Sequence, residues 1–285
     1  MAYLKAQGLT VVFDAEHFFD GYKANADYAM ACVRAASEAG ADSIDLCETN
    51  GGALPHEVDA VVAAVARELP GQQLGIHCHN DSGCAVANSL AAVRAGVTQV
   101  QGTVNGFGER VGNTDLLTVI ADLELKMGCT CVGEERLRDL TSVAQFVAET
   151  CNLSVPNHHP YTGASAFAHK GGLHASASAR CPEAYEHTRP EAVGNTQRML
   201  VSELAGKASL IAKAKNLGID LAQHPDKTQE ILDDIKRREA VGYSYEVADG
   251  SLALLLQWHL GAYRPHFTLE SFRVIVDDHE DTGAL

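Results

Sequence analysis

The chain has 285 residues, and 46% of them are hydrophobic, which is enough for a large buried core. Its formal net charge of −15 argues against nonspecific binding to nucleic acids or to anionic membranes. The composition therefore excludes a disordered chain and indicates one large globular domain, or a domain with an appendage.

The cysteine pattern is that of a protein kept in a reducing compartment. The eight cysteines form no CxxC pair, and we interpret the lone CxC of Cys129 and Cys131 as two reduced loop cysteines. The N-terminus lacks the basic and apolar regions of a signal peptide, and apolar runs such as Leu252–Leu256 are too short to span a bilayer. We therefore expect a cytoplasmic enzyme.

The first half of the sequence alternates between short apolar strands and amphipathic helices. The expected strands are Thr10–Phe13, Ser43–Leu46, Gln73–His77 and Gln99–Thr103. The expected helices are Ala24–Glu38, Pro55–Leu69, Cys84–Ala95 and Thr114–Met127. Repeated βαβ units of this kind predict a parallel sheet in an α/β fold.

Two parallel-sheet folds fit this pattern, a doubly wound sheet and an eight-stranded barrel. No GxGxxG phosphate loop follows a strand. Polar residues instead follow the strands, and they are Asp14 and Glu16, Glu48 and Thr49, His77 and His79, and Asn105. Polar strand ends are typical of a barrel active site. Because four βα units are visible and Met1–Lys5 resembles the end of a helix, we expect the C-terminal half of a (β/α)8 TIM barrel; an open sheet is the alternative.

The regular alternation stops near residue 150. Residues 152–200 are rich in Pro, His, Gly and Ser, and three helices are expected after them, at Lys207–Leu217, Pro225–Val241 and Ser251–Leu260. A strand is expected at Phe267–Asp277. We therefore predict a partial barrel over residues 1–150, a helical linker subdomain over 151–245 and the start of another small domain over 246–285.

The sharpest local motif is His77-Cys78-His79, which precedes Asn80 and Asp81 at the end of the third strand. Residues i and i+2 of a strand share a face, so both imidazoles should point into the site and Cys78 away from it. With oxygen ligands, two such imidazoles can bind Zn²⁺, Mn²⁺ or Mg²⁺. Ordinary surface or core histidines are the alternative for this motif taken alone.

Two further segments permit both a functional and a structural interpretation. The glycine-rich run from Gln101 to Asn113 lets the backbone approach a ligand closely, but Asn113 could equally be the N-cap of the next helix. Its Glu109-Arg110 pair could be a structural ion pair. Farther along, His174 and Tyr185 could form an acid–base pair or be ordinary loop residues.

Together these motifs resemble the 2-isopropylmalate synthase and homocitrate synthase family of metal-dependent acyltransferases. The run His77–Asn113 carries the resemblance to the whole family. The segments Phe13–Lys23, Cys47–Gly52 and Ala166–Gly172 are most similar to its citramalate synthase branch. The resemblance covers essentially the whole chain, in order.

The resemblance implies an acyltransferase of branched-chain amino-acid biosynthesis that condenses acetyl-CoA with a 2-keto acid. Pyruvate is the expected acceptor, giving citramalate on a route to isoleucine; a 2-isopropylmalate synthase of leucine biosynthesis is the alternative. The resemblance also implies His77 and His79 as ligands of a divalent metal (Mn²⁺, Mg²⁺ or Zn²⁺), with Asn113 in or beside the metal shell.

The resemblance assigns the remaining roles to four residues. Thr49 corresponds to the residue that binds the carboxylate of the keto acid, and Glu16 to a carboxylate that supports proton transfer. His174 and Tyr185 correspond to residues that a second subunit contributes to assist enolisation of acetyl-CoA. A homodimer is therefore expected, with residues 246–285 as the approach to a regulatory domain.

One departure from the family pattern limits these expectations. The family carries an Asp-Arg-Glu motif on its first barrel strand, which supplies a carboxylate ligand and a catalytic arginine, and this chain has no such motif; Asp14 is on the wrong strand to replace it. A metal-dependent lyase or aldolase and a non-catalytic fragment are therefore also considered. Because half a barrel leaves strand edges unpaired, we expect the chain alone to be poorly stable and inactive.

Overall fold

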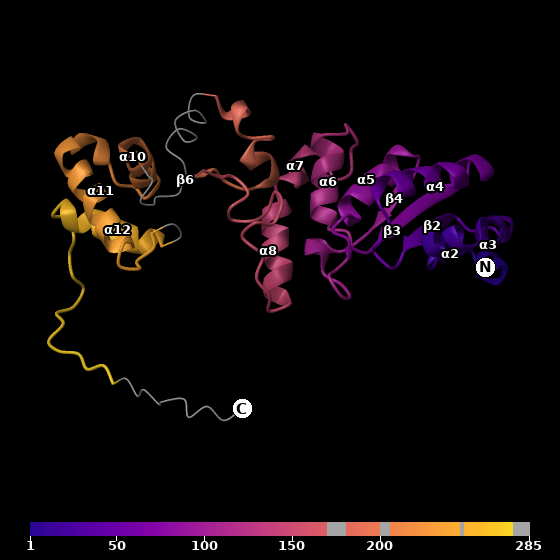
Figure 1. Cartoon of the computed structure of the whole chain (residues 1–285), viewed down its shortest axis with the longest axis horizontal. Coiled ribbons are helices and arrows are strands. Elements are labelled where there is room, and N and C mark those ends of the chain that lie inside the picture. Colours follow the sequence, from indigo (N-terminus) through magenta and orange to yellow (C-terminus); the bar gives the residue numbers. More distant parts are fainter. Residues whose placement is uncertain (170–180, 200–205, 246–247, 276–285) are drawn as a thin grey trace. The chain divides into compact units, whose positions relative to one another are not determined.

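The structure is a computed structural model that describes residues 1–169, 181–199, 206–245 and 248–275. The chain divides into two compact units (Figure 1). Unit 1 consists of Met1–Ala168 and Cys181–Arg198, and unit 2 consists of the other residues. No helix in these described ranges is both long and apolar enough to cross a membrane.

Unit 1 contains a sheet of four parallel strands in the order β1-β2-β3-β4 (Figure 1). The strands are β1 (Val12–Ala15), β2 (Ser43–Glu48), β3 (Gln73–Cys78) and β4 (Gln99–Gln101). Asp45 lies opposite Gly75, and His77 lies opposite both Cys47 and Gln101. The four predicted βα units and their parallel pairing are confirmed.

The helices next to this sheet are α1 (Ala2–Ala6), α2 (Phe18–Ala24), α3 (Ala26–Glu38), α4 (Pro55–Glu68), α5 (Ala85–Arg94) and α6 (Leu116–Leu125). The last four agree with the four predicted helices to within a few residues. The sequence pattern did not predict α2, because this helix is too short to show a helical period. The proposed N-cap at Asn113 is wrong, because Asp115 caps α6 by accepting hydrogen bonds from the N–H groups of Leu117 and Thr118.

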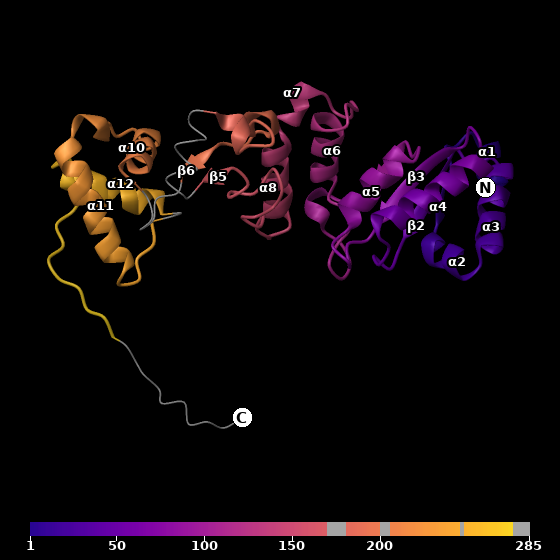
Figure 2. The same cartoon turned by 45° about the horizontal axis from the view of Figure 1, so that its top comes forward.

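The two faces of the sheet differ in chemistry. On one face the fully buried Ile44, Leu46 and Ile76 pack with apolar residues of α2 to α5. Figure 2 shows α4 and α5 beside β2 and β3. The opposite face carries polar side chains, including Asp45 and His77. Helices on one face and a polar inner face are what the predicted segment of a barrel requires.

The rest of unit 1 contains α7 (Glu134–Leu137) and α8 (Leu140–Thr150). The paired strands β5 (Ala168–His169) and β6 (Arg198–Met199) each have one residue in unit 1 and one in unit 2. The sequence reading had no helix at α8. Its buried residues Leu140 and Ala144 join Leu117 of α6 and Phe167 in a separate apolar cluster. This cluster anchors the segment that follows the sheet.

Unit 2 is helical where it is described. Its helices are α10 (Lys207–Asn216), α11 (Pro225–Glu239) and α12 (Asp249–His259), and they share a core around Leu210, Ile231 and Leu256. The strand expected at Phe267–Asp277 is wrong over its described part, because 267–275 contains no strand and has no described partner to pair with. The predicted domain limits of 1–150, 151–245 and 246–285 stay predictions.

Candidate active site

The carboxyl ends of the strands bring the predicted polar residues to one edge of the sheet. Side chains alternate along each strand, so Thr49 continues the face of Asp45, and His79 continues the face of His77. Cys78, between the two histidines, is fully buried in the apolar core, as its position in the strand predicts. Glu48 departs from the expected cluster, because it is 1% exposed and accepts hydrogen bonds from the N–H groups of Gly52 and Ala53.

Three of the predicted residues lie together. The imidazole centroids of His77 and His79 are 5.3 Å apart. His79 forms an isolated antiparallel bridge with Asn113, flanked by hydrogen bonds from the N–H of Asn80 to the carbonyl of Gly112 and from the N–H of Thr114 to the carbonyl of Cys78. Directly opposite residues of such a bridge point to the same side, with Cβ atoms about 4.5–5.5 Å apart. The amide of Asn113 therefore lies beside the imidazole of His79.

Within the part of the chain that the structure describes, two buried polar atoms of this cluster have no hydrogen-bond partner, namely His79 Nδ1 and Asn113 Oδ1. Burial, followed by the charges of His77 and Arg110, lowers the pKa of His79 and favours the neutral imidazole that binds metals. These residues fit a divalent cation with nitrogen and oxygen ligands. The described residues contain no group of three His, Cys, Asp or Glu side chains that could hold a metal, and the polar side chain opposite His79 is the amide of Asn113.

The loops after β1 and β2 place Thr49 and Glu16 near the same edge. The N–H of His17 donates to Thr49 Oγ1 at 3.0 Å, so the hydroxyl proton of Thr49 stays available for another acceptor. Glu16 is exposed, and its Oε1 lies 3.9 Å from Nε2 of His17. Thr49 therefore has a free donor, and Glu16 a solvent-accessible carboxylate.

Arg110 connects its own loop, which follows β4, with the loops that follow β2 and β3. Its Nε and Nη2 donate to the two carboxylate oxygens of Asp81 at 2.7 and 2.8 Å, and Nη2 also donates to the carbonyl of Thr49 at 2.8 Å. Glu109, the partner considered from the sequence, is 3.8 Å away. The guanidinium holds the pKa of Asp81 below its usual value. The closer ion-pair partner of Arg110 is thus Asp81 rather than its sequence neighbour Glu109.

The sequence did not predict a polar network around Gln101, below the histidines. The side chain of Gln101 accepts from His77 and donates to Asp14 and Asp45. Asp45 is fully buried. Strand alternation could have indicated this network, because Asp45 shares a face with Thr49, and Gln101 shares a face with Thr103.

The two acid–base candidates, His174 and Tyr185, come later in the sequence than this cluster. Tyr185 follows a short helix, Pro182–Ala184, in unit 1, and its side chain is 44% exposed. His174 lies outside the described residues. Their predicted roles stay predictions.

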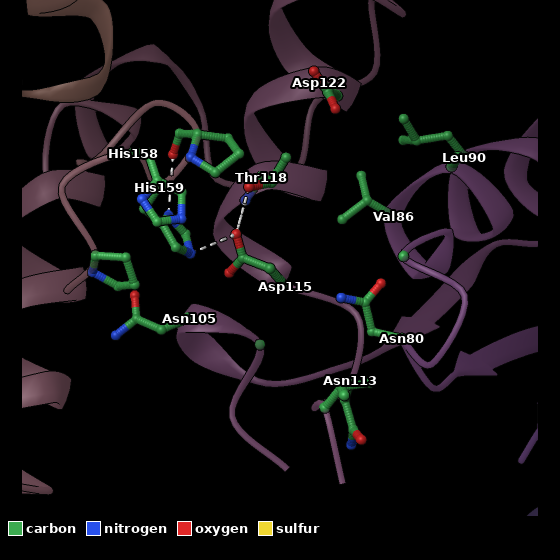
Figure 3. A pocket seen from close by; sticks show the side chains of 16 residues that line it. Asn80, Val86, Leu90, Asn105, Asn113, Asp115, Thr118, Asp122, His158 and His159 are labelled. Carbon is green, nitrogen blue, oxygen red and sulfur yellow. Dashed lines mark hydrogen bonds and ion pairs between the residues drawn. The ribbon is translucent and has the colours of Figure 1, made fainter. Parts of the chain in front are cut away.

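A cavity of about 580 Å³ adjoins the cluster on the side of Asn113 (Figure 3). One wall is formed by Val86 and Leu90 of α5. The other includes Asp115 and His159, whose Oδ2 and Nε2 atoms are 3.5 Å apart. A small molecule bound there would contact Asn113 as well as an apolar wall.

Comparison with known proteins identifies the relatives of this chain. An (R)-citramalate synthase of Streptomyces coelicolor is 53% identical over 99% of this chain and 53% of its own length. That of Geobacter sulfurreducens is 51% identical over 100% of this chain and 54% of its own length. The chain therefore spans about half the length of these two relatives. The resemblance to the citramalate synthase branch is confirmed.

One solved structure and two family models also match parts of this chain. An HMG-CoA lyase of Bacillus subtilis is 27% identical, with a TM-score of 0.41, over 46% of this chain and 45% of its own. The homocitrate synthase post-HMGL domain-like family matches residues 161–242. The HMGL-like family matches residues 1–147, more than half of the sequence. The chain belongs to the HMGL-like family.

Proposed function

We propose that the chain forms part of an acyltransferase that condenses acetyl-CoA with pyruvate to give citramalate and free CoA. The observation that carries this proposal is the similarity to (R)-citramalate synthases over nearly the whole chain, combined with the His77, His79 and Asn113 cluster at the strand ends. The reaction belongs to amino-acid biosynthesis, with isoleucine as the proposed end product.

The proposed cofactor is a divalent cation, Mn²⁺, Mg²⁺ or Zn²⁺. His77, His79 and Asn113 would hold it through two imidazole nitrogens and one amide oxygen. The unpaired His79 Nδ1 and Asn113 Oδ1 support this assignment, because buried polar atoms in proteins are normally hydrogen-bonded. When bound, the cation supplies Lewis acidity that polarises the carbonyl group of the keto acid.

In the proposed reaction, the protein orients both substrates and moves protons. The hydroxyl of Thr49, which accepts from the N–H of His17, donates a hydrogen bond to the carboxylate of pyruvate. A base removes a proton from the acetyl methyl group, with Glu16 supporting the transfer, and the resulting carbon bonds to the carbonyl carbon of pyruvate. That carbonyl oxygen takes up a proton. Water then hydrolyses the thioester, which releases CoA.

The remaining roles need a second subunit. His174 and Tyr185 of that subunit are proposed to assist the enolisation of acetyl-CoA. The proposed assembly is a homodimer, and no nucleic acid or membrane partner is proposed. The proposed location is the cytoplasm, which the eight cysteines support, since all of them are free thiols.

The acceptor is tested with the full-length protein of which this chain forms part. CoA thiol release from acetyl-CoA is measured in the presence of pyruvate, 2-ketoisovalerate or 2-ketoglutarate. The proposal predicts the highest kcat/KM with pyruvate. A preference for 2-ketoisovalerate would instead indicate a 2-isopropylmalate synthase. CoA release that requires no keto acid would indicate simple hydrolysis of the thioester and would contradict the proposal.

A further inference from the structure

A network of hydrogen bonds runs from the buried Asp45 of β2 to His77. Asp45 is fully buried, and its Oδ2 accepts from Nε2 of Gln99 at 2.8 Å and from Nε2 of Gln101 at 2.6 Å. Its Oδ1 accepts from the hydroxyl of Ser43 at 2.6 Å. Oε1 of Gln101 lies 2.9 Å from Nδ1 of His77. The network thus ends on His77, a proposed metal ligand.

The register of the sheet makes this hydrogen-bond network possible. Asp45, Gly75 and Gln99 lie opposite one another on adjacent strands, one row below His77 and Gln101. A Cβ atom added to Gly75 would lie 2.2 Å from Oδ1 of Asp45. Because Gly75 has no side chain, Asp45 extends across β3 to both glutamines of β4.

The orientation of the Gln101 amide follows from its partners. Nε2 donates to Asp45 and, at 3.1 Å, to the exposed Asp14. A carboxylate accepts hydrogen bonds and has none to donate, so both groups require the NH₂ end of the amide. The carbonyl end, Oε1, is therefore turned toward His77.

An amide oxygen can only accept a hydrogen bond, so the Nδ1 atom of His77 must carry the proton. In the neutral imidazole this leaves the lone pair on Nε2. Partners of this kind orient metal-binding histidines and determine which nitrogen faces the metal.

We infer that Gln101, oriented by Asp45, is a positioning residue that fixes His77 in the Nδ1-protonated tautomer and leaves Nε2 as its ligand nitrogen. The ligand role rests on the proposed function, whereas the tautomer depends only on this network. Gln101 acts through His77 and need not touch a substrate.

The test compares two glutamines that share one partner. Gln101→Leu removes one donor from Asp45 together with the contact to His77, whereas Gln99→Leu removes the other donor and leaves His77 untouched. Gln101→Met provides a second variant of similar length. The ring nitrogens of His77 are assigned by ¹⁵N–¹H correlation spectroscopy of the metal-free protein at about pH 8.

The parent and Gln99→Leu are expected to show protonated Nδ1 in His77. Gln101→Leu and Gln101→Met are expected to shift toward the Nε2-protonated form, which an unrestrained imidazole prefers in water. An unchanged tautomer in both Gln101 variants, or the same shift in Gln99→Leu, would overturn the inference.

Titration with Co²⁺ alone, followed by its visible absorbance, provides the second readout. Both Gln101 variants are expected to bind Co²⁺ about 10–100-fold more weakly than the parent, as is usual when the partner of a ligand is lost. Gln99→Leu should bind like the parent, and equal weakening in Gln99→Leu would overturn the inference. Failure of the parent to bind Co²⁺ would contradict the proposed metal site, and the tautomer comparison would still decide the inference.

Discussion

Arg110 has an unusual backbone conformation for an arginine, with φ of 56°, in the left-handed region. Such a conformation costs free energy in a residue with a side chain and persists where surrounding contacts hold it. Here the contacts are the bidentate pair with Asp81 and the hydrogen bond to the carbonyl of Thr49. At the scale of a single residue, Arg110 thus ties the proposed substrate-binding loop to the loop that follows the histidines.

We predict that Arg110→Lys lowers kcat/KM for pyruvate by up to about 100-fold, because a small displacement of a substrate-binding group has effects of this size. Lysine cannot form the bidentate pair, so Thr49 would lose its support. Steady-state kinetics measure the effect. Glu109→Gln is the matched control, since Glu109 is mostly exposed and 3.8 Å from Arg110. An equal loss in the control would refute the role of Arg110.

Strand alternation predicted the orientation of individual residues but not their partners. The i, i+2 rule placed His77 and His79 on one face and Cys78 on the other without knowledge of the sheet. The link from Gln101 to Asp45 spans 56 residues of sequence and depends on the register of β2, β3 and β4. Pairings of this kind follow from tertiary structure, so the network was not predictable from local patterns.

At the scale of the elements, β2 and β3 fit because Gly75 leaves room for Asp45. We predict that Gly75→Ala destabilises the protein by about 1–3 kcal/mol, the usual cost of overpacking a filled interior. The added methyl group would overlap the Asp45 carboxylate. Urea unfolding measures the loss. Gly52→Ala serves as control, because a Cβ at Gly52 meets no atom within 4 Å and should have little effect.

The start of α6 offers a second test with an internal control. Asp115 accepts hydrogen bonds from two backbone N–H groups at the helix start, whereas Asp139, the N-cap of α8, makes no side-chain capping bond. Asp115→Ala should therefore lower the free energy of unfolding by about 0.5–2 kcal/mol. Asp139→Ala should change it far less. Equal effects in thermal unfolding would show that the cap of α6 contributes nothing specific.

Most elements were predictable because their periodicity is strong and their ends are marked. Pro55 at the start of α4 and Gly40 after α3 are examples. The sequence reading missed α2 and α8. The seven residues of α2 are too few to show a helical period, whereas α8 carries an amphipathic pattern, with Leu140, Ala144 and Ala148 on its buried face, that the prediction overlooked.

At the scale of the whole molecule, each unit has its own apolar core. In unit 2, the buried Asp234 accepts from His259 at 3.0 Å and from Arg238 at 3.1 Å. The hydrogen bond from His259, followed by Arg238, lowers the pKa of Asp234. Because the folded pKa lies below the unfolded one, this stabilisation is present above about pH 4 and is lost as the pH falls further.

We predict that Asp234→Asn destabilises unit 2 by about 1.5–3 kcal/mol at neutral pH, the usual contribution of hydrogen bonds to a charged group. The difference from the parent should shrink as the pH falls below about 4, where the parent aspartate becomes protonated. Urea unfolding at several pH values measures this. Asp233→Asn is the control, because Asp233 is exposed and bonded to Gln229 alone among described residues. A pH-independent difference for Asp234→Asn would contradict the assignment.

The central claim is that His77 and His79 hold the divalent cation on which condensation of acetyl-CoA with pyruvate depends. It is tested most directly with the full-length protein of which this chain forms part, by measuring pyruvate-dependent CoA release after the metal is stripped and Mn²⁺ is added. The parent and the control His56→Ala, which changes an exposed histidine of α4, should recover activity. His77→Ala and His79→Ala should remain at least about 100-fold lower. Recovery of parental activity in both of these variants would contradict the claim.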